Sequence, residues 1–415
     1  MKVAYYSPQP PERSGIADYS ALLLPALAER IDVDVVGRRS RRQRRRADVS
    51  LYHIGNEPEA HGWIVEALRR RPGIVVLHDF VLHHLVAGMT LGRGDGGGYL
   101  DAMQREAGPV GRMLAHGVID ELLPPLWEDR AVEYPLAGEV LVSANGLIVH
   151  SAYVERLVRD SGYREPLWRI PHPAWPAPAE IASVELPEGR TIIGCYGHLN
   201  PAKRLPQLLE AFALLRRRVP EALLLLVGSL SPGLELEPVY DRLGLRPGDD
   251  MIRLDYVDEA RLWSLLSACE VCVNLRYPTM GETSGIVVRA LSLGRPLLVS
   301  DVGWFAELPD EAALKVPVGE GEIPAIADAL ELLLRDPALR RRMGDAARAL
   351  AQGEHRLERV AEAYVAALEE AAGGVMVQDA VLGEMARAAA ETGLAANGRA
   401  LSDVAERLRE VGPGR

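Results

Sequence analysis

The sequence contains little cysteine and few aromatic residues, and it has no long hydrophobic run. Its 3 cysteines among 415 residues exclude a disulfide framework. Cys269 and Cys272 form a C-x2-C pair, but no second pair or histidine cluster completes a zinc site, so we interpret both as small buried hydrophobes. No segment approaches the ~18 apolar residues of a membrane span. Polar residues follow the short apolar start at residues 1–6, unlike in a secretory signal, so we expect a cytoplasmic protein.

Two nucleotide-binding patterns and an overall positive charge are also missing. The chain has no G-x4-G-K-[ST] and no G-x-G-x-x-G after a strand, which disfavours plain phosphoryl transfer and NAD binding. A formal net charge of −11 gives no footprint for nucleic acid. One basic run, Arg38–Arg46, has two interpretations. It is either a solvated surface loop or an electrostatic handle for a phosphorylated acceptor or for anionic lipid at the inner membrane face.

Short apolar runs alternate with helical patterns along most of the chain. The runs typical of buried strands are 2–7, 31–36, 49–55, 73–79 and 146–151 in the first half, and 191–197, 222–228, 251–257, 271–277, 295–301 and 313–319 in the second. The helical patterns between them are 20–30, 60–71, 99–129, 152–162, 204–218, 259–268 and 285–294. This alternation predicts an α/β fold with two parallel, doubly wound sheets.

A proline-rich segment divides the two halves. Residues 172–180 hold three prolines in nine residues, which is typical of an interdomain linker. We predict Rossmann-like domains at 1–174 and 178–355 that face each other across a cleft, where ligands bind beyond the carboxyl ends of the strands. A helical tail follows at 356–415. Its first helix, 356–372, is expected to pack back toward the first domain, with two more helices beyond Gly374.

The strongest chemical signal lies in residues 278–310. A strand ends there in a turn rich in glycine, serine and threonine, and Thr283 and Ser284 are candidate N-caps of a helix that begins near Gly285. The first turn of such a helix presents free N–H groups and the positive end of the dipole, which suits a phosphate. Glu282 stands just before the helix, where its carboxylate is suited to the hydroxyls of a sugar beside that phosphate.

This stretch resembles the signature of glycosyltransferase family 4, an E-x7-E motif that opens a helix and ends in a Gly-x-Pro turn. Glu282 and Gly285 match its start, and Gly294 and Pro296 match its end. The resemblance implies a GT-B fold and a retaining transfer of a hexosyl group from a UDP- or GDP-sugar, without metal or other cofactor. The family's second Glu, which holds the ribose hydroxyls, corresponds to Arg289. That departure points to an altered ribose or phosphate contact.

A second match lies at residues 194–212. The family has a Gly-Arg-Leu turn followed by a Lys, and its Arg and Lys neutralise the donor diphosphate, whose charge builds up in the transition state. Gly197 and Lys203 match, whereas His198 replaces the Arg and Arg204 is the candidate to compensate. A solvated lysine at a helix start is the alternative for Lys203. The resemblance places the nucleotide base near the loops of Gly228, Tyr256 and Val257.

The first domain matches the family more weakly. His78 stands where the family has a His aimed at hydroxyls of the donor sugar. Plain turn, capping or core roles are the alternatives for the candidate acceptor contacts, which are Gly15, Asp18, Tyr19, His53 and Asn56. A metal site at His78, His83 and His84 is the other alternative, but their spacing matches no known zinc motif, so we expect no metal.

Three function classes remain open from the sequence. The favoured one is a transferase that acts through positioning and electrostatics, in which the leaving phosphate helps to deprotonate the hydroxyl of a sugar, lipid-linked or small-molecule acceptor. A sugar-nucleotide 2-epimerase is the second, but it requires paired carboxylates, and no clear pair is visible. The third is a catalytically altered protein that binds a nucleotide sugar or a partner, which the departures at His198 and Arg289 suggest.

Overall fold

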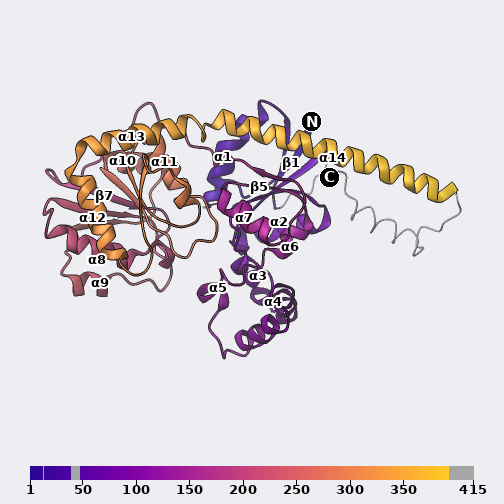
Figure 1. Cartoon of the computed structure of the whole chain (residues 1–415), viewed down its shortest axis with the longest axis horizontal. Coiled ribbons are helices and arrows are strands. Elements are labelled where there is room, and N and C mark those ends of the chain that lie inside the picture. The colour runs from indigo at the N-terminus through magenta and orange to yellow at the C-terminus, as the bar shows by residue number, and fades with distance from the viewer. Residues whose placement is uncertain (13, 39–46, 392–415) are drawn as a thin grey trace.

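The computed structural model describes residues 1–12, 14–38 and 47–391, which form two α/β domains and a long final helix (Figure 1). The first domain contains a parallel six-stranded sheet in the order β2-β1-β3-β4-β5-β6. Its strands are β1 Lys2–Tyr6, β2 Asp32–Val36, β3 Val49–Ile54, β4 Gly73–Leu77, β5 Ala144–Val149 and β6 Leu167–Arg169. β3 and β4 are buried along their whole length, as expected of strands covered on both faces. The sequence did not predict the edge strand β6, because three residues are too short for a pattern.

Helices cover both faces of this sheet. They are α1 Gly15–Ala28, α2 Pro58–Arg70, α3 His83–Met89, α4 Gly96–Ile119, α5 Leu126–Asp129, α6 Gly138–Ser143 and α7 Ala152–Asp160, with the short 3-10 helix η1 Leu91–Arg93. The helical stretch predicted over 99–129 is divided between α4 and α5. α4 is interrupted at Ala107 and Gly108, and Gly108 has a φ of 61°, which is a left-handed conformation that glycine tolerates. Pro109 follows, and its ring prevents the helix from continuing unbroken.

The second domain repeats the plan with a parallel sheet in the order β12-β11-β10-β7-β8-β9. Its strands are β7 Thr191–Tyr196, β8 Ala222–Val227, β9 Met251–Leu254, β10 Val271–Asn274, β11 Leu297–Ser300 and β12 Ala313–Val316. Its helices are η2 Pro201–Lys203, α8 Leu205–Arg216, α9 Glu237–Leu243, α10 Glu259–Ala268, α11 Gly285–Leu293, η3 Gly303–Glu307, α12 Glu322–Arg335 and α13 Pro337–Gln352. The predicted fold class, two parallel doubly wound sheets with a helical C-terminal part, is confirmed.

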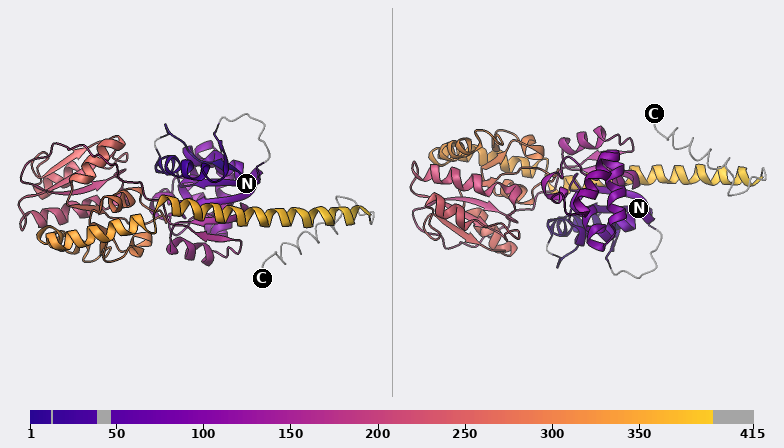
Figure 2. Two further views of the ribbon diagram at one scale, coloured as in Figure 1. Left: turned by 90° about the horizontal axis from the view of Figure 1, so that it is seen from above. Right: turned by 90° about the horizontal axis from the view of Figure 1, so that it is seen from below.

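The last helix, α14 Leu357–Glu391, leaves the second domain and lies along the first, as both views of Figure 2 show. Buried Tyr364 shares a 2.7 Å hydrogen bond with buried Tyr19 of α1. The predicted end of this helix near residue 372 is wrong, since it continues through two glycines to Glu391. Glycine costs about 1 kcal/mol in a helix interior, and the alanines and glutamates before the pair offset that cost.

The basic run 38–46 lies outside the described residues except for Arg38, so the predicted electrostatic handle stays a prediction. The predicted cytoplasmic location also stays a prediction. No helix in the described part of the chain is both long and apolar enough to cross a bilayer.

Candidate active site

The two domains meet where the carboxyl ends of their strands face each other. Phe80 N and Val81 N, just after β4, donate to Met280 O in the loop between β10 and α11, at 2.8 and 3.0 Å. Farther along, Glu307 of η3 accepts hydrogen bonds from two backbone N–H groups in the first turn of α7, at 2.9 and 2.6 Å. Main-chain contacts therefore fix the loop that carries Glu282 against the loop that follows His78.

A cavity of about 410 Å³ opens between the domains beside these contacts. It brings together eight of the residues predicted from the sequence: Gly15, Tyr19, Asn56, His78, Glu282, Thr283, Gly285 and Arg289. It is also lined by Asp79 and Trp175, which the sequence did not single out. Both domains and the linker thus contribute side chains to one cavity, as an enzyme with two substrates requires.

Glu282 is held in a defined orientation at the wall of this cavity. One carboxylate oxygen accepts hydrogen bonds from Thr279 Oγ1 at 3.0 Å and Met280 N at 2.7 Å, and the other pairs with Arg276 Nε at 2.8 Å. Arg276 follows β10 and is mostly buried, with 12% of its side chain exposed. The sequence did not identify Arg276, because no local pattern distinguishes it from other arginines at strand ends.

Lys203 ends η2, between the glycine turn that follows β7 and the start of α8. Its ammonium is buried and donates to Tyr196 O at 2.8 Å. Lys203 and Ile286, the second residue of α11, both pack against Gly197. A Cβ added to this glycine would lie 3.6 Å from Lys203 Nζ and 3.5 Å from Ile286 Cγ1. Burial, with the positive charge of Arg276 nearby, lowers the pKa of Lys203 to about 8. A second positive charge therefore stands close to Lys203.

The first turn of α11 completes this positively charged corner. Ser284 is the N-cap: its Oγ accepts from Val287 N at 3.3 Å and from Asn274 Nδ2 at 3.2 Å. Thr283 Oγ1 is buried and has no hydrogen-bond partner among the described residues. The N–H groups of the first turn, from Gly285 onward, have no acceptor within the helix. An anion beside Gly285 would meet these donors, with the positive charge of Lys203 behind them.

The other predicted donor-binding cation is used elsewhere. Arg204 pairs with buried Glu322 of α12, with Nε 3.0 Å from Oε1, so its charge is neutralised within the domain. His198 lies on the surface and bonds to Ser229 Oγ at 3.2 Å and Ser231 Oγ at 2.9 Å. Neither side chain lines the cavity between the domains, and Lys203 and Arg276 do not line it either. The structure therefore places Arg276, rather than Arg204, beside Lys203.

The predicted base-binding loops lie next to this corner. Gly228 has a φ of 138°, and a Cβ there would clash with the carbonyl oxygen of Gly197, so only glycine fits. Tyr256, which follows β9, is 58% exposed, and Val257 beside it is half-buried. These two residues do not line the cavity.

Arg289 connects both domains and the linker. Its guanidinium lies 3.6 Å from the centroid of the Trp175 indole ring, and only 5% of the residue is exposed. Its Nη2 is 3.4 Å from Glu259 of α10 and 3.8 Å from Asp18 of α1. Burial raises the pKa of Asp18, and the charge of Arg289 opposes that effect. The predicted acceptor contact Asp18 is thus a partner of the predicted ribose contact Arg289.

An Arg289→Ala variant should be less stable than the wild type by about 1–3 kcal/mol, because it loses a desolvated cation–π contact and two ion pairs with partly exposed carboxylates. The melting temperature measures this loss. Arg217→Ala, at an exposed arginine of the same domain, is the matched control and should change little. Equal melting temperatures for the two variants would contradict this interpretation of the Arg289 contacts.

The first domain contributes a cluster of neutral imidazoles. His53 Nδ1 and His78 Nε2 are 3.0 Å apart, and burial holds the pKa of both rings well below the usual range. His78 lines the cavity, whereas His53 is fully buried behind it. Tyr19 packs edge-on against His78 with 4.8 Å between ring centroids. Of these three predicted residues, His53 therefore supports His78 and does not reach the cavity.

Asp79 follows His78 and, like Arg276 and Trp175, was not identified from the sequence. Its Oδ2 accepts a hydrogen bond from Asn56 N at 2.9 Å, while the Asn56 side-chain oxygen accepts from Leu85 N at 3.1 Å. Burial, strengthened by the negative charge of Glu282 across the cavity, raises the pKa of Asp79 to about 7. The cavity therefore contains carboxylates from both domains: Glu57 and Asp79 from the first and Glu282 from the second.

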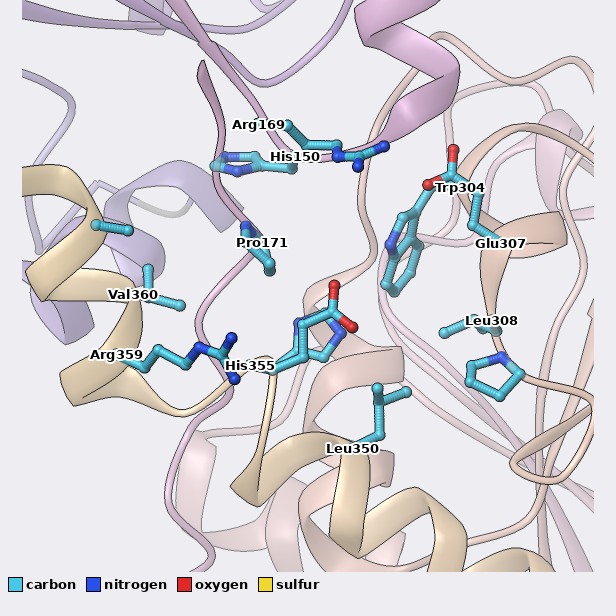
Figure 3. Close-up of a pocket in the computed structure, with 13 residues that line it drawn as sticks. His150, Arg169, Pro171, Trp304, Glu307, Leu308, Leu350, His355, Arg359 and Val360 are labelled. Atoms are coloured by element: carbon cyan, nitrogen blue, oxygen red, sulfur yellow. The ribbon is translucent and has the colours of Figure 1, made fainter. Parts of the chain in front are cut away.

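A larger cavity, of about 580 Å³, lies at the junction of the domains with α14 (Figure 3). Arg169 and His150 of the first domain, Trp304 and Glu307 of the second, and Arg359 of α14 line it. It contains none of the residues around the start of α11, so we place the candidate active site at the smaller cavity. Within residues 1–12, 14–38 and 47–391, no group of three or more His, Cys, Asp or Glu side chains is arranged to hold a metal ion.

The second domain matches a known protein family. Residues 177–350 match the model of the family Glycosyl transferases group 1. The uncharacterized glycosyltransferase YqgM of Bacillus subtilis (strain 168) is 28% identical over 220 residues, which is 52% of this chain and 59% of YqgM. Alignments with curated relatives span between 43% and 59% of the relatives' own lengths.

Two solved structures are similar over most of the chain. Sucrose-phosphate synthase from Thermosynechococcus elongatus has a TM-score of 0.60 at 20% identity, covering 89% of this chain and 98% of that one. HepE from Anabaena, in complex with UDP and glucose, has a TM-score of 0.59 at 16% identity, covering 89% of this chain and 100% of that one. The chain therefore has the GT-B fold, and its second domain is similar in sequence to group 1 glycosyl transferases.

Proposed function

We propose that the chain is a glycosyltransferase that moves a hexosyl group from a nucleotide-sugar donor to a hydroxyl acceptor. One observation carries the proposal: Glu282, Thr283 and Gly285, at the start of α11, line the cavity between the domains, and the cations Arg276 and Lys203 lie behind them. The cations and the helix N-terminus suit a leaving diphosphate, and the fixed carboxylate suits the hydroxyls of its sugar.

The nucleotide is proposed to be UDP or GDP, and the transfer to retain the anomeric configuration without a metal. The resemblance to glycosyltransferase family 4 supports retention, and the HepE structure with UDP and glucose, on the same fold, supports UDP. Two protein cations at the diphosphate corner supply the charge that a divalent metal would otherwise provide. The anomeric proton coupling of the product, measured by NMR, tests retention.

The carboxylate pair favours a sugar-nucleotide epimerase as a second candidate. Asp79 and Glu282 face the cavity from opposite domains, as an acid and a base would. Glu282, however, accepts hydrogen bonds from Thr279 and Met280 and pairs with Arg276, an arrangement that suits a hydrogen-bond acceptor for sugar hydroxyls better than a group that exchanges protons. An epimerase needs proton exchange on two faces of a carbon, which makes transfer the better proposal.

Thermal shifts with UDP, GDP, ADP and dTDP, with and without magnesium, test the donor site directly. A ligand present at 100 times its Kd stabilises the native state by about 2.7 kcal/mol. We expect one nucleotide, UDP or GDP, to raise the melting temperature equally with and without magnesium. A shift that requires magnesium would overturn metal independence, and no shift with any nucleotide would overturn the donor site and favour a partner-binding protein.

A further inference from the structure

Asp79 occupies a distinctive position in the candidate active site. It follows β4 at the carboxyl end of the sheet, and its Oδ2 is fixed by the Asn56 N–H at 2.9 Å. Its Oδ1 has no hydrogen bond within the described part of the chain, and the residue lines the cavity. The next two residues, Phe80 and Val81, bond to Met280 O, which holds Asp79 next to the loop of Glu282. One oxygen is therefore anchored and the other is available to a ligand.

The other groups at the cavity are poor proton acceptors. Glu282 accepts two hydrogen bonds on Oε2, from Thr279 and Met280, and its Oε1 pairs with Arg276. His78 shares its Nε2 with His53, and burial holds the pKa of His78 well below the usual range. Glu57 also lines the cavity, but it is exposed, and none of the described residues fixes its carboxylate by a hydrogen bond. Among the described carboxylates of the cavity, Asp79 alone combines a fixed orientation with an oxygen that no protein group binds.

We propose that Asp79 accepts the proton of the acceptor hydroxyl during transfer. This inference rests on the proposed glycosyl transfer. The acceptor oxygen forms a bond to the anomeric carbon, the bond from that carbon to the diphosphate oxygen breaks, and the electron pair leaves with the diphosphate. The proton passes from the acceptor oxygen to Asp79 Oδ1. The resemblance alone assigns this proton to the leaving phosphate, whereas the cavity provides a carboxylate on the opposite domain.

The surroundings of Asp79 tune it for this role. The charged and titratable groups that face it are His61 of α2, His84 of α3, its neighbour His78, and Glu282 and Arg276 of the second domain. Burial and Glu282 raise its pKa to about 7, while Asn56 N–H and Arg276 oppose that rise. A base with a pKa near the working pH gives the best compromise between being ionised and being basic. Activity should therefore rise as the pH increases through about 7.

The test compares Asp79→Asn with the wild type and with Asp32→Asn, which removes an exposed carboxylate on β2, outside the cavity. Asparagine keeps the size of Asp79 and an oxygen for Asn56 N–H. The rate of nucleoside diphosphate release is measured from UDP-, GDP-, ADP- and dTDP-linked hexoses with glycerol and glucose as acceptors. We expect Asp79→Asn to lower kcat by about 100-fold or more, to leave the KM for donor unchanged, and to abolish the acid limb of the pH profile. Asp32→Asn should match the wild type.

A stability measurement checks the charge of Asp79 without any substrate. A carboxyl whose folded-state pKa is raised favours folding at low pH, and that contribution is lost as the pH rises through about 7. The melting temperature of Asp79→Asn relative to the wild type should therefore be higher at pH ~8 than at pH ~5. A difference that does not vary with pH would overturn the assignment.

The outcomes separate this inference from the proposed function. Unchanged kcat and an unchanged acid limb in Asp79→Asn would place the proton on the phosphate and overturn the role of Asp79 alone. Loss of the nucleotide thermal shift in Asp79→Asn would also overturn it, since the residue would then maintain the site. No release from any donor by folded wild-type protein would overturn the proposed function and this inference with it.

Discussion

A Lys203→Met variant is expected to lose about 100- to 1,000-fold in kcat, the loss typical when one group that stabilises developing charge is removed. The Lys203 ammonium is buried between the Gly197 turn and the start of α11, where water cannot replace it. When the bond to the sugar breaks, negative charge moves onto the diphosphate, and the interaction with Lys203 strengthens at that moment. Steady-state release of the nucleoside diphosphate measures the effect.

The same variant should remain folded. Methionine has a length similar to that of lysine. The variant loses the hydrogen bond to Tyr196 O, worth about 1 kcal/mol, but it no longer buries a charged ammonium, and this second effect offsets the first. Lys315→Met is the control, because Lys315 lies on the edge strand β12 and pairs with Asp310. A Lys203→Met enzyme within about threefold of the wild type would show that the diphosphate binds elsewhere, since 1.4 kcal/mol already changes a rate tenfold.

Lys203 also predicts the alkaline side of the pH profile. Its pKa of about 8 in the free protein means that the ammonium is lost as the pH rises through that value. kcat/KM, which reports the free enzyme, should therefore fall above pH ~8, and the alkaline limb should be absent in Lys203→Met. Together with an acid limb near 7 from Asp79, this predicts a narrow, bell-shaped dependence of kcat/KM on pH.

The fold was largely predictable because buried strands leave a local pattern. β8, with its six buried residues ALLLLV, cannot be mistaken for a surface segment. The errors lie where a local pattern is weak or ambiguous. The three-residue β6 has too few residues to show a period, and the helical composition around α4 concealed the break at Gly108. In α14, two glycines suggested an end, although the flanking residues sustain the helix.

The site was predictable only where one segment contains the motif. Glu282 and Lys203 each stand in a strand–turn–helix unit, so their environment follows from nearby residues. Arg204 looked equivalent to Lys203 in the sequence, but its partner is Glu322, which is 118 residues away. Asp79 and Arg276 acquire their roles from contacts between the domains, which no spacing in the sequence encodes.

Arg289 illustrates the same limit in another way. The sequence identified it as a departure from the family pattern, because arginine replaces the expected carboxylate. The structure shows its actual partners, which are Trp175 in the linker, Glu259 in the same domain and Asp18 in the other domain. A residue that looked like an altered ligand contact thereby also stabilises the relative placement of the two domains.

A Glu282→Gln variant is expected to lose at least about 100-fold in kcat, because the fixed carboxylate is a stronger hydrogen-bond acceptor for sugar hydroxyls than an amide. The change also leaves Arg276 without its 2.8 Å partner, next to the buried ammonium of Lys203. Two uncompensated cations should lower the melting temperature as well. Glu311→Gln, at an exposed carboxylate of the same domain, is the control for both measurements.

The pH dependence of the residual activity gives a sharper result than its size. The charge of Glu282 is the second cause, after burial, of the raised pKa of Asp79. Removing that charge should lower the pKa of Asp79, because a neighbouring anion no longer opposes its ionisation, and Arg276 continues to favour it. The acid limb of Glu282→Gln should therefore lie at lower pH than that of the wild type. If the limb stays near 7, the group that titrates there is not Asp79, and the acceptor proton must leave by another route.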